Sequence, residues 1–121
     1  MPNQDPPMSD FRPPMDALIQ ALNRLVEVLK HDPESQWLMV FAEALDDCRR
    51  LGPEAPPDDS RALASRLLRL FGGAGSFGDY APVRPAPGVG WQVIPGMEEL
   101  DAIAEEVQAR ALALRLATEA S

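Results

Sequence analysis

An all-α fold is predicted for this chain: a small four-helix bundle with a long loop, rich in glycine and proline, between the third and fourth helices. Four stretches repeat apolar residues at three- and four-residue spacing, which is the pattern of helices with one buried face. The 13 prolines cluster between these stretches. A length of 121 residues fits a single core. We therefore expect a flexible N-terminal arm over residues 1–14 and one helical domain over residues 15–121.

The arm holds five prolines and few large apolar residues, which is typical of an extended segment. The first helix is predicted to begin near Pro14 or Met15, because proline is tolerated in a first turn. It should end at His31-Asp32-Pro33. Its apolar stripe comprises Met15, Leu18, Ile19, Leu22, Leu25, Val26 and Leu29.

The second helix follows at once, with Asp32 as the predicted N-cap and Pro33 in the first helical position. Gly52-Pro53 should end it. Such a short connection predicts that the first two helices form an antiparallel hairpin. The stripe of the second helix comprises Trp37, Phe41, Ala44, Leu45 and Cys48.

A third, shorter helix is predicted after the proline-rich link, with Asp58 or Asp59 as its cap and Gly72-Gly73 as its end. Its stripe comprises Leu63, Ala64, Leu67, Leu68 and Phe71.

Residues 72–96 form the least regular stretch, and loops of this length are often functional or disordered. Its segment Trp91-Gln92-Val93-Ile94 has the composition of a strand but no evident pairing partner. We expect this segment to be extended and pressed against the helices.

The fourth helix is predicted from about Met97 to the C-terminal end. Glu98, Glu99 and Asp101 would occupy its first turn, where the helix dipole favours negative charge. Its stripe comprises Leu100, Ile103, Ala104, Val107, Ala111 and Leu114.

The net charge of −8 and a pI near 4.5 argue against nucleic acid and against anionic membranes as partners. They favour encounter with a basic protein, although acidity can also serve solubility alone. A single cysteine excludes an internal disulfide, and no secretory signal or apolar run of roughly 20 residues is evident. We expect a cytoplasmic protein.

Residues 73–78 match the G-x-G-x-x-G pattern of phosphate-binding loops. A phosphate-binding loop would follow a strand, whereas this one follows a predicted helix, so the structural interpretation is preferred. In that interpretation Gly72 or Gly73 caps the third helix, and Gly75 and Gly78 allow positive φ. Ser76 bonds the loop backbone and Phe77 fills the core.

No catalytic residue, metal ligand or cofactor is predicted. His31 is the only histidine and has no cluster of cysteine or histidine near it, so a role at the helix end is expected. Cys48 lies on an apolar stripe and is interpreted as a core residue. Two acidic sets, one around Asp46 and Asp47 and one around Glu98 and Glu99, are either solvated helix faces or a patch for a basic partner.

Residues 71–79 read F-G-G-A-G-S-F-G-D. This loop resembles F-G-G-x-G-S-F-x-D in a family of small, uncharacterised bacterial helical proteins, in which it joins an amphipathic helix to a final acidic helix. The resemblance covers the layout of about residues 15–116, and the proline-rich stretch after Asp79 departs from it. The family has no established activity. By type, the chain also resembles immunity proteins, which block the active site of a bacterial toxin.

The leading hypothesis is therefore a non-enzymatic immunity protein that occludes a basic toxin domain. The alternatives are a structural or regulatory homo-oligomer, and a ligand-binding domain whose glycine loop binds an anion. Trp91 and Tyr80 are the aromatic anchors available for an interface, with Trp91 expected to be the more buried of the two. The candidate partner-binding residues are Asp46, Asp47, Ser76, Phe77, Asp79, Tyr80, Trp91, Glu98 and Glu99.

Overall fold

A computed structural model describes residues 12–52, 54–72 and 76–119 as four helices and one small hairpin. The four-helix prediction is confirmed, but the fold is mainly α rather than all-α, because the loop contains two strands. The elements in chain order are α1 (Arg12–Leu29), α2 (Gln36–Leu51), α3 (Pro57–Arg69), the 3-10 turn η1 (Phe77–Asp79), β1 (Val83–Ala86), β2 (Gly90–Val93) and α4 (Leu100–Glu119).

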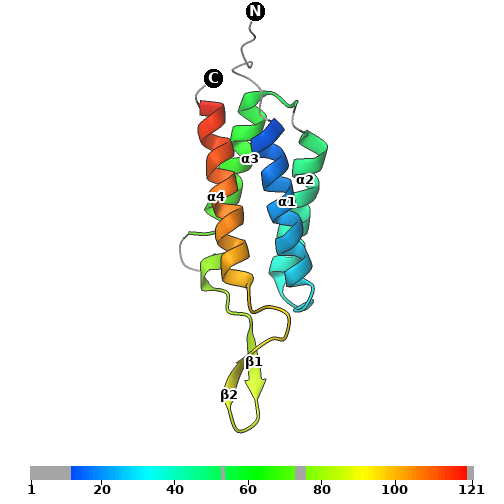
Figure 1. Cartoon of the computed structure of the whole chain (residues 1–121), viewed down its shortest axis with the longest axis vertical. Coiled ribbons are helices and arrows are strands. Elements are labelled where there is room, and N and C mark those ends of the chain that lie inside the picture. The colour runs from blue at the N-terminus through cyan, green and yellow to red at the C-terminus, as the bar shows by residue number, and fades with distance from the viewer. Residues whose placement is uncertain (1–11, 53, 73–75, 120–121) are drawn as a thin grey trace, which may run out of the picture.

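The helices run alternately up and down, and the hairpin extends from the lower end (Figure 1). α1 packs against α2 and α4, and α4 packs against α3, whereas the contact between α2 and α3 is smaller than these three. The antiparallel pairing predicted for the first two helices is confirmed. The connection between α1 and α2 and the segment before α4 both lie at the end that carries the hairpin.

The core lies between the helices and is built from the predicted stripes. Met15, Leu18, Leu22, Leu25 and Leu29 of α1 are fully buried. The other helices contribute Phe41, Leu45 and Cys48, then Leu63 and Leu67, then Val107, Ala111 and Leu114. These residues form one continuous apolar cluster, as expected when amphipathic helices bury one face each.

The helix starts differ from the prediction. α1 already begins at Arg12, so Pro13 and Pro14 lie in its first turn, and residues 1–11 of the predicted arm lie outside the described residues. α2 begins at Gln36 with Ser35 as its N-cap, whose hydroxyl accepts from the Trp37 N–H at 3.1 Å. Asp32 is therefore not the cap.

Neither of the aspartates predicted to cap α3 does so. α3 starts at Pro57, with Pro56 in the N-cap position. Asp58 and Asp59 lie in the first turn, where their negative charge still interacts favourably with the helix dipole. The C-cap of α3 is Leu70, not Gly72 or Gly73, and Gly73 lies outside the described residues.

α4 begins at Leu100, three residues later than predicted. Met97 donates its N–H to the Ile94 carbonyl, and Leu100 donates to the Met97 carbonyl, so residues 94–99 form turns before the helix. Met97 is buried and fixes this turn to the core.

Candidate functional site

One end of the bundle brings together segments that are far apart in the sequence. We call it the hairpin end and define it as residues 30–35 and 76–99, which connect α1 to α2 and η1 to α4 (Figure 1). Seven of the nine predicted partner-binding residues lie there: Ser76, Phe77, Asp79, Tyr80, Trp91, Glu98 and Glu99.

Phe77 anchors the hairpin end to the core. Only 5% of its side chain is exposed, and its ring meets Phe41 edge-on with centroids 4.9 Å apart. Its other aromatic neighbours are Trp37, Phe71 and Tyr80. The prediction that Phe77 fills the core is confirmed, and its additional assignment as a partner contact stays a prediction, since the ring is buried but also lines a small cavity beside α4.

Ser76 holds the glycine-rich loop in shape. It is the N-cap of η1, and its hydroxyl accepts from the Gly78 N–H at 3.3 Å, as predicted. The expectation of a positive φ at Gly78 is wrong, since among the described residues positive φ occurs only at Gly52, Gly88, Gly90 and Gly96. Gly78 matters for space instead, because a Cβ there would lie 3.1 Å from the Phe71 carbonyl oxygen. Gly75 lies outside the described residues.

Tyr80 ties this loop to the connection between α1 and α2. Its hydroxyl donates to an Asp32 carboxylate oxygen at 2.6 Å. Partial burial raises the pKa of Tyr80, and the hydrogen bond to Asp32 and its negative charge raise it further. Asp32 therefore makes a contact across 48 residues of sequence rather than capping α2, which explains why local sequence signals misplaced it.

His31 and Gly96 form the second tie across this end. Gly96 has a φ of 92°, and a Cβ built on it would come within 2.6–2.8 Å of the His31 imidazole atoms. The imidazole thus lies directly over the glycine backbone. Only glycine suits this position, for its backbone conformation and for the space.

The hairpin replaces the extended segment that we expected against the helices. β1 and β2 are antiparallel, and Val83 pairs with Val93, Arg84 with Gln92, and Pro85 with Trp91. Ala86, Pro87, Gly88 and Val89 close it in a turn with proline second, glycine third at a φ of 78°, and a 3.1 Å bond from the Val89 N–H to the Ala86 carbonyl. This is the arrangement of a type II turn.

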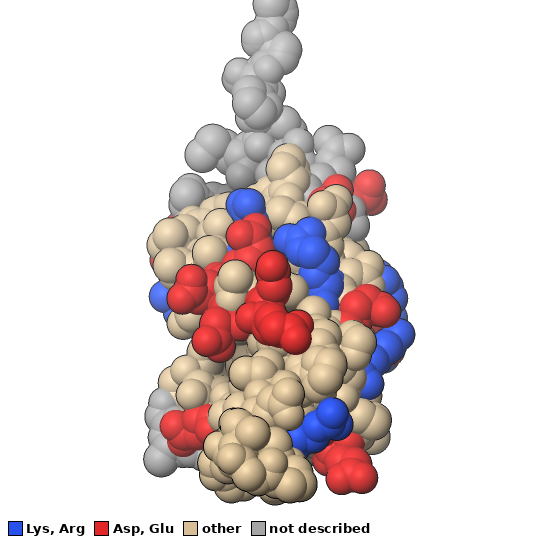
Figure 2. All heavy atoms as spheres, turned by 60° about the horizontal axis from the view of Figure 1, so that its bottom comes forward, with Lys and Arg blue, Asp and Glu red and all other residues tan. Residues whose placement is uncertain are grey.

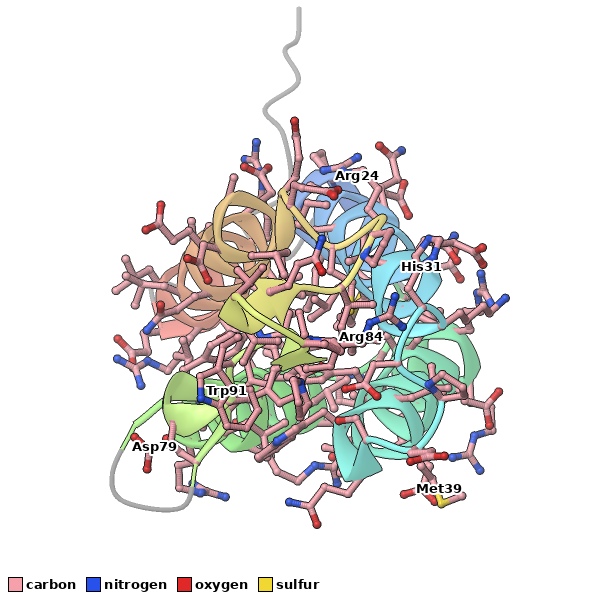
Figure 3. The ribbon with its side chains drawn as sticks, turned by 90° about the horizontal axis from the view of Figure 1, so that it is seen from below. Arg24, His31, Met39, Asp79, Arg84 and Trp91 are labelled. Carbon is pink, nitrogen blue, oxygen red and sulfur yellow. The ribbon has the colours of Figure 1, made fainter. Side chains whose placement is uncertain are left out.

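Trp91 is therefore exposed, contrary to the expectation that it would be the more buried anchor. Its side chain is 67% exposed, whereas Tyr80 is half-buried. Directly paired residues point to the same face of a hairpin, so Val83, Pro85, Trp91 and Val93 share one face and Arg84 and Gln92 the other. Seen from below, Trp91 and Arg84 lie on different sides of the hairpin, and Asp79 lies toward the side of Trp91 (Figure 3).

The acidic residues fall into two separate places. Glu98 and Glu99 are exposed at the hairpin end, and the Glu98 carboxylate accepts from the Gly96 N–H at 3.1 Å. Figure 2 shows a compact group of acidic side chains on the face that is seen with this end turned forward.

Asp46 and Asp47 belong to a different surface, near the far end of α2. Asp47 forms ion pairs with Arg50 and, at 2.6 Å, with Arg66 of α3, and Asp46 lies 3.8 Å from Arg50. Asp47, but not Asp46, lines a groove between α2 and α3 together with arginines. The structure therefore does not unite all nine predicted residues in one site.

A small cavity that the sequence did not indicate lies between η1 and α4. Its volume is about 230 Å³, below the roughly 300–1,000 Å³ typical of small-molecule sites. Aromatic residues Phe71, Phe77 and Tyr80 line one side, and Asp101 and Glu105, one helical turn apart on α4, line the other. Carboxylates beside aromatic rings suit a single cationic side chain.

Cys48 has the core position expected of it, whereas the role predicted for His31 at the helix end stays a prediction, since the contact described for its imidazole is with Gly96. Cys48 is fully buried, and burial together with the nearby negative charge of Asp47 raises its thiol pKa to about 12.

Within residues 12–52, 54–72 and 76–119, no group of three or more histidine, cysteine, aspartate or glutamate residues could hold a metal ion.

Comparisons with known proteins return no match: no family model, no curated protein and no solved structure matches this chain. No helix among the described residues is long and apolar enough to cross a membrane.

Proposed function

We propose that this is a non-enzymatic binding protein of the immunity type, which neutralises a toxin by covering its active surface with the hairpin end. The observation that carries the proposal is the exposure of Trp91. Tryptophan is among the residues most enriched in the energetic centres of protein interfaces. Val89 and Val93, on the same hairpin, are 72% and 42% exposed, so this hairpin groups three of the six exposed large apolar residues in the described part of the chain.

Charge supports a basic partner. The hairpin end and the first turn of α4 carry six carboxylates against two fixed cations, Lys30 and Arg84. The carboxylates are those of Asp32, Glu34, Asp79, Glu98, Glu99 and Asp101. A negative surface around an apolar centre accelerates encounter with a positive one, and the effect weakens with salt. The cavity beside Tyr80 would accept one lysine or arginine side chain of the partner.

The ties within the hairpin end support binding in a second way. Phe77, the bond from Tyr80 to Asp32 and the contact of His31 with Gly96 fix the base of the hairpin before any partner arrives. A surface that is ordered in advance loses less conformational entropy on association.

Co-expression with the product of the adjacent gene tests the proposal. We expect a co-purifying complex and rescue of growth. Trp91→Ala should weaken the complex by at least about thirtyfold, the scale of an interface centre. Met39→Ala is the matched control, because Met39 is 68% exposed on α2 and lies away from Trp91 (Figure 3). It should change affinity by less than about twofold.

Absence of both a complex and rescue with the wild-type protein would refute the toxin partner. Equal effects of the two substitutions would refute the hairpin end as the contact surface. Light scattering of the isolated protein separates this function from the homo-oligomer, since the proposal requires a monomer.

A further inference from the structure

The outer edge of β2 has backbone groups that pair with nothing in the described structure. The Ile94 N–H donates to the Pro82 carbonyl at 2.8 Å. This bond makes Pro82 and Ile94 a hydrogen-bonded pair, and such pairs alternate with non-hydrogen-bonded pairs in an antiparallel ladder. Arg84 and Gln92 are therefore hydrogen-bonded to each other. The pairs on either side of them, Val83 with Val93 and Pro85 with Trp91, are not. The N–H and C=O groups of Trp91 and Val93 therefore point away from β1.

The outer edge of β1 is closed in comparison. Pro85 has no N–H, and the Val83 N–H already donates to the Ala81 carbonyl at 2.9 Å. Proline on an edge strand is a common protection against pairing with other chains. The hairpin thus has one protected edge and one open edge.

β2 is short, but it lacks the two protections that side chains provide, charge and proline. Its residues, Gly90, Trp91, Gln92 and Val93, include no charge and no proline, and all four are exposed. Tryptophan and valine favour strands. An open edge of this composition is a template for another strand.

We propose that β2 binds an extended, basic segment of the partner protein by strand addition, so that the segment becomes the third strand of the sheet. Its backbone would pair with Trp91 and Val93, and its alternate side chains would contact the apolar face of the hairpin. This inference rests on the proposed function and gives its binding mode.

Charge selects this occupant over a second copy of the chain. Glu98 and Glu99 follow β2 within six residues and are exposed, and Asp79 lies toward the side of Trp91 (Figure 3). Two copies, each with a net charge of −8, repel one another, whereas lysines or arginines in an added strand would be attracted by the excess of carboxylates at this end.

Amide hydrogen exchange in the wild-type protein tests the pairing, with a synthetic hexapeptide that alternates lysine and valine as the probe. At saturating peptide we expect exchange of the Trp91 and Val93 N–H groups to slow by about tenfold or more, and that of Gln92, already bonded to β1, to change little. A hexapeptide that alternates glutamate and valine is the charge-reversed control. Absence of protection, or equal protection by both peptides, would overturn the proposal.

Two substitutions at one position isolate the backbone contribution. Val93→Pro removes an outward N–H and keeps the bonds to β1, which reproduces the situation of Pro85. Val93→Thr keeps the N–H and a similar shape. We expect Val93→Pro to weaken peptide binding by roughly tenfold relative to Val93→Thr, the scale of one lost hydrogen bond. Equal affinities of two folded variants would contradict strand addition.

Three further results separate the possible failures. A dimer of the wild-type protein with the Trp91 and Val93 N–H groups protected in the absence of peptide would show that the occupant is a second copy, and would overturn the proposal. If Val93→Pro still neutralises the toxin at wild-type strength, strand addition fails and the proposed function stands. If the wild-type protein neutralises nothing, the proposed function fails, and the peptide experiment still decides whether the edge accepts a strand.

Discussion

The two halves of the irregular segment between α3 and α4 have opposite relations to the bundle. Residues 76–80 are fixed to the core: Phe77 is 5% exposed and lies among four aromatic rings. Residues 83–93 pair with one another and project, and every residue of β2 is exposed. One stretch of glycine and proline thus provides both an anchor and a projecting arm. Stability should depend on the first half and recognition on the second.

The largest effect on stability is expected in the anchor. Phe77→Ala should lower the free energy of unfolding by about 3–5 kcal/mol, because it leaves a cavity among the aromatic rings. Chemical denaturation measures this change. Trp91→Ala, in the projecting half, is the matched control and should cost less than about 0.5 kcal/mol. Similar losses for the two variants would remove the distinction between the halves.

The contact between His31 and Gly96 gives the next effect. Gly96→Ala should cost about 2–3 kcal/mol, because it combines an unfavourable positive φ with a collision at the imidazole. Gly88→Ala has a similar φ but open space around it and should cost only about 1 kcal/mol. Adding His31→Ala to Gly96→Ala should restore part of the lost stability, because it removes the colliding imidazole. Adding His31→Ala to Gly88→Ala should restore none. Denaturation midpoints of the four variants decide this prediction.

The bond from Tyr80 to Asp32 gives the smallest effect at neutral pH, about 1–2 kcal/mol for Tyr80→Phe. It also has a pH signature. The pKa of Tyr80 is higher in the folded protein than in the unfolded chain, where it is near 10. The contribution of Tyr80 to the free energy of unfolding is therefore fully present below pH 10 and declines as pH rises above 10. Cys48, whose pKa is raised to about 12, adds a decline that begins near pH 9.

Unfolding measured from pH 8 to 11.5 should therefore show falling stability in the wild-type protein. Tyr80→Phe and Cys48→Ala should each make the fall less steep, and the double variant less steep still. A slope that neither substitution changes would mean that both groups have the same pKa values folded and unfolded.

The helices were predictable from the sequence because each one buries a stripe set by local spacing. The starts of α2 and α3 were not predictable. Asp32, the expected cap of α2, instead bonds Tyr80 from a distant segment. In α3, Pro56 takes the N-cap position that was expected for Asp58 or Asp59. The hairpin was missed because β1 contains a proline and does not alternate. The signal that could have revealed it is the turn sequence Ala86-Pro87-Gly88-Val89, which lies between two short segments of suitable length.

The candidate site was predictable in part. Aromatic and acidic residues near the glycine loop do gather at one end, because the loop and the residues before α4 share that end of the bundle. Asp46 and Asp47 were grouped with them on charge alone, although their charges are taken up by Arg50 and Arg66. Burial of Phe77 and exposure of Trp91 both depend on tertiary pairing, which composition does not report.

The exposure of Trp91 on a projecting hairpin is the claim on which the proposals depend, and fluorescence quenching tests it directly. The chain has two tryptophans, Trp37 and Trp91, so Trp37→Phe leaves Trp91 as the only tryptophan, which can be excited selectively over Tyr80. We expect red-shifted emission that the neutral quencher acrylamide quenches nearly as well as it quenches free tryptophan, and much weaker quenching of Trp37 in Trp91→Phe. Blue-shifted emission from Trp91 that resists acrylamide would show that the hairpin folds back onto the bundle, and would contradict this account.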